Sequence, residues 1–113
     1  MADKRDIRRI RKRIPIRFGI ENADRVAFTE DMSMTGMFIR TPNIVLPNSK
    51  FIIECILPDC SKVVIEARVM WAKKVPQNLL HLVKKSGMGV RFLRFNSGEE
   101  AFDDFFEKIA TPP

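Results

Sequence analysis

The stretch FIIECILPDCSKVVIEARVMW, residues 51–71, predicts two antiparallel strands joined by a short turn. On both sides of the turn at Pro58, apolar residues alternate with other residue types, which is the period of a strand with one buried face. The residues expected on that buried face are Phe51, Ile53, Cys55, Leu57, Val63, Ile65, Ala67, Val69 and Trp71. The stretch therefore predicts a hairpin that supplies one side of a hydrophobic core.

Four further segments have the same character. Residues 14–20 alternate Ile14, Ile16, Phe18 and Ile20 with other residues, and shorter segments begin at Val26, Met37 and Met88. Turn-forming residues such as Asn, Asp, Pro and Gly separate the segments. Six short strands at hairpin-like spacing are typical of a small antiparallel β-barrel.

The pattern changes near the C-terminus. Ser97 followed by Glu100 has the spacing of a capping box, so a helix is predicted at about residues 97–110. Its apolar stripe consists of Ala101, Phe102, Phe105, Phe106 and Ile109, and we expect this stripe to pack on the core. The predicted fold is mainly β: a six-stranded antiparallel β-barrel with a C-terminal amphipathic α-helix.

The net charge of +6 is confined to one end of the chain. Residues 1–17 hold eight basic side chains against Asp3 and Asp6, whereas the rest of the chain has twelve of each sign. We therefore predict two parts: a flexible basic N-terminal arm at residues 1–13 (the basic arm) and a barrel domain with its helix at residues 14–113.

Catalytic and metal chemistry find little support in the sequence. Cys55 and Cys60 have no CxxC spacing and are expected to be free thiols, and His81 is the one histidine. The chain has no Gly-rich phosphate loop either. We expect a protein that is not an enzyme and that needs no metal or cofactor.

No stretch of the sequence reaches the length of an apolar membrane span, and no apolar segment follows the basic residues at the start. These features predict a cytoplasmic protein without a membrane span.

Arginines dominate the basic arm, in the run Arg8-Arg9-Ile10-Arg11-Lys12-Arg13. The planar fork of arginine binds phosphate oxygens and the O6 and N7 atoms of guanine, and its flat face stacks on bases. Arg9 and Arg13 lie four residues apart, a spacing that puts them on one side of either a strand or a helix. A solvated basic tail is the simpler interpretation of the same run.

A second polar cluster is Asp31-Met32-Ser33-Met34-Thr35-Gly36. On an extended segment Asp31 and Ser33 share a face, where a carboxylate can accept the paired N–H donors of a guanine edge. Gly36 either turns the chain or lets a ligand approach the backbone. Taken alone, the cluster also fits an ordinary turn between two strands.

Taken together, these clusters make the chain resemble the PilZ family over nearly its full length. The resemblance is carried by RxxxR at Arg9 and Arg13, DxSxxG at residues 31–36 and GMGVRF at residues 87–92, in that order. Other arginine pairs here also fit RxxxR. In the family the second arginine directly precedes the first strand, which selects Arg9 and Arg13.

The resemblance implies a non-enzymatic receptor for the bacterial second messenger cyclic di-GMP. The implied contacts are Arg9 and Arg13 to phosphates and guanine, Asp31 to a guanine edge, Ser33 to phosphate or base, Gly36 through close approach to the backbone, and Arg8 by stacking on a further guanine. A single domain of this kind must act through a downstream partner protein.

Two other functions stay open at this point. The basic arm is also suited to nucleic acid or an anionic surface, although Phe18 is the nearest aromatic residue for stacking, so DNA is not the expected partner. The third possibility is a protein-interaction adaptor of the PilZ fold that binds no nucleotide.

Overall fold

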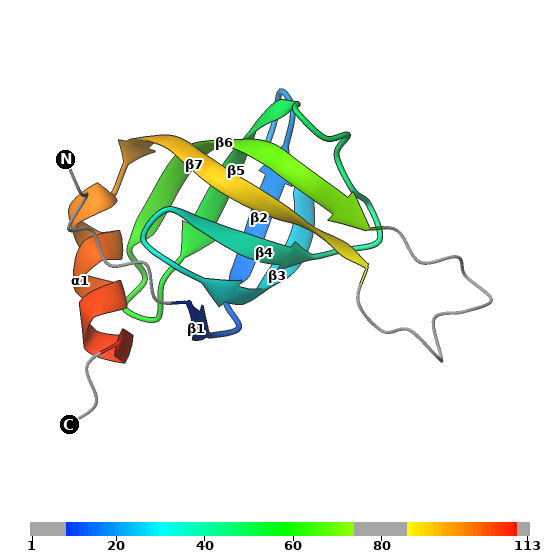
Figure 1. Ribbon diagram of the computed structural model, residues 1–113. Coiled ribbons are helices and arrows are strands. Elements are labelled where there is room, and N and C mark those ends of the chain that lie inside the picture. The colour runs from blue at the N-terminus through cyan, green and yellow to red at the C-terminus, as the bar shows by residue number, and fades with distance from the viewer. Residues whose placement is uncertain (1–8, 74–85, 111–113) are drawn as a thin grey trace, which may run out of the picture.

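The computed structural model describes residues 9–73 and 86–110 and shows a closed β-barrel with one helix at its end (Figure 1). The elements are β1 (Ile10–Arg11), β2 (Pro15–Gly19), β3 (Arg25–Met32), β4 (Gly36–Arg40), β5 (Lys50–Ile56), β6 (Lys62–Lys73), β7 (Gly87–Ser97) and α1 (Glu99–Ala110). Neighbouring strands follow the order β3-β2-β5-β6-β7-β4, and β4 pairs back to β3. All the pairings are antiparallel, so the predicted barrel and C-terminal helix are confirmed.

Strand β1 is an addition to the six expected strands. Ile10 and Arg11 pair with Met32 and Asp31 at the end of β3, beside the stretch of β3 that pairs with β2. Between β1 and β2, the Lys12 N–H donates to the Glu30 carbonyl at 3.1 Å. Two residues that the sequence assigns to the basic arm thus belong to the sheet. Residues 1–8 lie outside the described part, and flexibility of the arm stays a prediction.

The period-2 pattern correctly identifies most of the core. Every residue expected on the buried face of 51–71 is buried except Trp71, and Ile14, Ile16 and Phe18 of the first segment are buried as well. Phe102 and Phe106 of α1 are fully buried and join the same cluster. The phenylalanine stripe therefore closes one end of the barrel, as expected.

Two apolar residues do not follow the pattern. Ile20 is 63% exposed because β2 ends at Gly19, so the alternation does not continue past that point. Trp71 is 52% exposed because the pairing of β6 with β7 shifts between Val69 and Trp71. That β-bulge turns the Trp71 side chain to the outer face of the barrel.

The helix begins one residue later than a Ser97 cap requires. Ser97 is the last residue of β7, and the Gly98 carbonyl accepts the first helical hydrogen bond, from the Phe102 N–H at 3.0 Å. Gly98 has a φ of 81°, which favours glycine at this junction. Within the two described ranges, no helix has the length and apolarity needed to cross a membrane.

The two cysteines are free, as expected, and their surroundings differ. Burial raises the pKa of the Cys55 thiol to about 12, whereas Cys60 is exposed. Since the thiolate is the reactive form, a maleimide reagent at neutral pH should modify Cys60 quickly and Cys55 only after denaturant is added. Mass spectrometry of the native and denatured protein measures this. Equal rates in the native protein would contradict the burial of Cys55 in the core.

Candidate functional site

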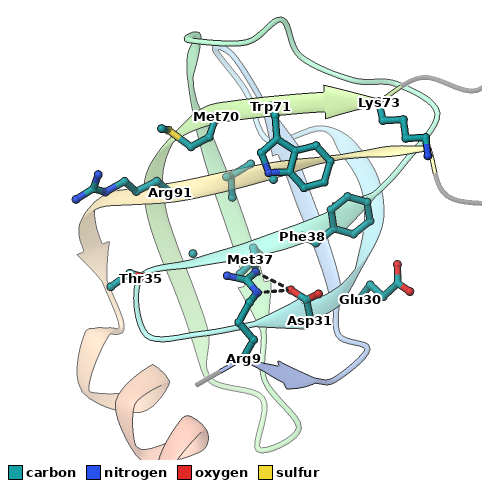
Figure 2. Close-up of a pocket in the computed structure, with 13 residues that line it drawn as sticks. Arg9, Glu30, Asp31, Thr35, Met37, Phe38, Met70, Trp71, Lys73 and Arg91 are labelled. Carbon is teal, nitrogen blue, oxygen red and sulfur yellow. Dashed lines mark hydrogen bonds and ion pairs between the residues drawn. The ribbon is translucent and has the colours of Figure 1, made fainter. Parts of the chain in front are cut away.

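A cavity of about 750 Å³ lies on the outer face of the barrel (Figure 2). It is lined by residues of β3, β4, β6 and β7 together with Arg9, which immediately precedes β1. The volume is within the range of about 300–1,000 Å³ that is usual for small-molecule sites. We refer to this feature as the main cavity.

One row of directly opposed residues crosses the main cavity. Asp31 of β3 is opposite Phe38 of β4, Phe38 is opposite Gly89 of β7, and Gly89 is opposite Trp71 of β6. Directly opposed residues of an antiparallel sheet share a face. The register therefore places a carboxylate at one end of the row and an exposed indole at the other, and Gly89 is the position between Phe38 and Trp71.

Two β-bulges put this row on the outer face. One falls at Glu30, between the paired residues Thr29 and Asp31, and the other at Met70, between Val69 and Trp71. Thr29 and Val69 are buried. In a regular strand Asp31 and Trp71 would lie on the same buried face, because each is two residues further along the chain. The bulges shift the alternation by one, so Asp31 and Trp71 both point outward.

The two aromatic rings lie over glycines of β7. Phe38 and Trp71 stack with ring centroids 5.3 Å apart and an interplanar angle of 24°. A Cβ atom on Gly89 would come within 2.3 Å of the Trp71 Nε1 atom, and one on Gly87 within 2.6 Å of the Phe38 ring. The missing side chains let both rings lie close to the sheet and form an aromatic platform.

Arg9 and Asp31, both proposed from the sequence as site residues, are in contact. The Arg9 Nε and Nη2 atoms donate to Asp31 Oδ1 at 3.0 Å and 2.6 Å, as the dashed lines in Figure 2 mark. The side chains are 50% and 32% exposed, so solvent reaches this ion pair. A pair of this kind contributes only about 0–1 kcal/mol, and a ligand with competing donors and acceptors can exchange with it.

Arg13 does not line the main cavity with Arg9. Its guanidinium carbon lies 4.1 Å from the centroid of the Phe28 ring, in a neighbouring cavity. Glu30 lines both cavities, so the two arginines lie along the same strand in adjacent hollows. Arg8 falls outside the described residues.

Ser33 and Gly36 belong to the turn between β3 and β4. Ser33 is buried, its N–H donates to the Gly36 carbonyl at 2.8 Å, and its hydroxyl accepts the Thr35 N–H at 3.2 Å. Gly36 lines the main cavity, but a Cβ there would lie 2.3 Å from the Val90 carbonyl oxygen. The close approach that Gly36 allows in this structure is therefore to strand β7.

Sequence reasoning missed the aromatic and cationic lining of the main cavity. Phe38, Trp71, Lys73 and Arg91 line it, and they come from strands far apart in the sequence. The available signal was the pair of glycines in GMGVRF, because glycine inside a strand often marks a close approach. Within the part of the chain that the structure describes, no cluster of His, Cys, Asp or Glu side chains is suited to a metal ion.

This lining is suited to a nucleotide. An aromatic platform stacks bases, the carboxylate of Asp31 accepts N–H donors, and the cations at the rim, Arg91 and Lys73, attract phosphates.

Comparison with known proteins gives a family and a fold. The sequence profile described as the PilZ domain matches residues 3–106. The solved structure of the Bacillus subtilis inhibitor of motility MotI/DgrA aligns with 97% of this chain at a TM-score of 0.70 and 11% identity, and this chain covers 50% of that protein. The PilZ domain of CeSA from a cellulose-synthesizing bacterium aligns with 89% of this chain, at a TM-score of 0.60 and 19% identity, and 97% of that domain is covered. No curated protein matches the chain.

Two glycine substitutions should separate the platform from the fold. Gly36→Ala meets backbone, so we expect it to destabilise the domain by about 1–3 kcal/mol, measured by thermal unfolding. Gly89→Ala meets the Trp71 ring instead. It should red-shift the fluorescence of this one tryptophan of the chain and increase its quenching by acrylamide, with a smaller loss of stability. Unchanged fluorescence in Gly89→Ala would contradict the packing of the indole on β7.

Proposed function

This chain belongs to the PilZ family, and we propose that it is a non-enzymatic receptor that binds cyclic di-GMP in the main cavity and passes the signal to a partner protein. The observation that carries this proposal is the row that joins Asp31 to the stacked rings of Phe38 and Trp71. It combines a planar apolar surface with an acceptor at its edge. A guanine base offers the matching face and the matching N–H donors.

We infer that one guanine stacks on the exposed face of Trp71 and directs its Watson–Crick edge to Asp31. In the free protein, the Arg9 guanidinium occupies Asp31 with two N–H donors on one carboxylate oxygen. The N1–H and N2–H groups of guanine present a similar pair of donors. Binding then becomes an exchange in which guanine takes the carboxylate and Arg9 turns to a ligand phosphate or to guanine O6 and N7.

Further cations are proposed for the second half of the ligand. Arg91 and Lys73 line the main cavity and Arg13 lies in the next hollow along β3, so a ligand with two phosphates can reach cations on both sides. For Ser33 and Gly36 we propose an indirect role, because their interactions hold the turn beside Asp31. Stacking of Arg8 on a second guanine stays a prediction.

The second candidate function is a protein-interaction adaptor. It is favoured by the likeness to a protein described as an inhibitor of motility, of which this chain covers half. An adaptor would use the outer face without needing a nucleotide in the main cavity. The two candidates therefore differ in one measurable quantity, the affinity for cyclic di-GMP.

We expect isothermal titration calorimetry to detect binding of cyclic di-GMP and not of cyclic di-AMP or GTP. Binding should also quench the fluorescence of Trp71. Arg9→Ala and Asp31→Ala should each weaken binding by about 1.5–3 kcal/mol, the range for hydrogen bonds to charged groups. Arg9→Lys should not restore it, because the guanidinium fork is lost.

Arg25→Ala is the matched control, since Arg25 is an exposed arginine at the start of β3 outside the main cavity. Binding should weaken only gently with salt, because each ligand carries two phosphates; a steep salt dependence for DNA would instead favour the nucleic-acid alternative. Absence of heat and of fluorescence change with the folded wild-type protein would contradict the receptor function.

A further inference from the structure

Three cations are directly opposed on the outer face of the barrel. Lys50 of β5 is opposite Arg68 of β6, and Arg68 is opposite Arg91 of β7. We call these three residues the cationic row. Like charges directly opposite each other in a sheet are destabilising, so the fold maintains this row at a cost in stability.

In the described part of the chain, none of the three cations of the row forms an ion pair with an acid. The acids of β5 and β6 on the same face bind other cations: Glu66 accepts from Arg94 at 3.1 Å, and Glu54 is 3.6 Å from Lys62. The Nε atom of Arg68 is buried, and within the described residues it has no hydrogen-bond partner. A buried donor without a partner adds a further cost to the fold.

Helix α1 carries a complementary set of charges. Glu100, Asp104 and Glu107 are exposed and follow the spacing i, i+4, i+7, so they form one stripe along the helix, here called the acidic stripe. Glu100 and Asp104 are like charges one turn apart, and Glu107 lies near the helix C-terminus, where the helix dipole disfavours a negative charge. Glu100 in the first helical turn and Lys108 four residues after Asp104 offset part of this cost.

We propose that the acidic stripe of one copy of this chain docks on the cationic row of a second copy. The dimensions agree: two inter-strand spacings give the row a length of about 10 Å, and seven helical residues give the stripe about 10 Å. Each copy carries both surfaces, so a two-fold axis lets the two copies exchange the same contact twice. Each contact places acids against cations, so it reduces both the repulsion within the cationic row and the repulsion within the acidic stripe.

Exposed apolar side chains beside the cationic row strengthen the contact. Met70 lies two residues after Arg68 and Leu93 two residues after Arg91, and they are 49% and 42% exposed. Exposed ion pairs contribute little each, so burial of these side chains is needed for a stable dimer. The contact requires no nucleotide, but Met70 and Arg91 also line the main cavity, so a docked helix and a ligand in that cavity would share part of one surface.

Sedimentation equilibrium tests the pairing with the whole chain and no ligand. We expect a concentration-dependent dimer at low salt that dissociates at high salt. Arg68→Glu and Asp104→Arg should each shift the protein to monomer. These are the middle members of the row and the stripe, so the combined Arg68→Glu/Asp104→Arg variant should recover the dimer in either helix orientation.

Thermal unfolding separates loss of association from loss of folding. Arg68→Glu should leave the monomer at least as stable as the wild type, because the new carboxylate lies between Lys50 and Arg91. Lys50→Glu, at an exposed position, is a second disrupting variant, and Arg25→Glu is the control that should keep the dimer. A wild type that stays monomeric at low salt overturns the proposal. So does a folded combined variant that fails to recover the dimer.

Discussion

The pairing of β4 with β3 on one side and β7 on the other is the constraint on which the site depends. It closes the barrel and fixes the register that sets Asp31 opposite Phe38 and Phe38 opposite Gly89. A slip of one residue would turn every side chain of β4 to the other face. The buried Met37 and Ile39 would then lie in solvent, so the hydrophobic core and the cavity lining are held in place by the same register.

Period-2 alternation was sufficient to predict the barrel, because β5 and residues 62–69 of β6 bury one face and follow that period closely. It was wrong for Trp71, since an inserted residue in β6 is invisible to a pattern that counts positions. It was wrong for Ile20, because the sequence gives no sign that β2 ends at Gly19. The capping-box motif was also misleading about where the helix begins. Ser97 pairs with Val64 as the last residue of β7, so it does not cap the helix, which begins at Glu99.

Candidate site residues could be predicted where they belong to a recognisable motif. Arg9 of RxxxR and Asp31 of DxSxxG do form an ion pair in the structure. Their surroundings could not be predicted, because Phe38 and Trp71 reach the cavity only through pairing of strands distant in sequence. The aromatic residue nearest to the basic arm along the sequence is Phe18. Phe18 is fully buried, whereas Phe28 stacks under Arg13 and Trp71 is exposed.

The bulge at Met70 means that strand length, rather than residue identity, decides whether the indole belongs to the core or to the surface. Removing one residue from β6 would restore strict alternation and direct Trp71 inward, with every motif letter of the chain intact. An exposed aromatic surface of this kind can therefore arise or disappear by a single codon insertion or deletion. Two chains that share the arginine and aspartate motifs can differ in their aromatic platform for that reason, and an alignment that closes such a gap would conceal the difference.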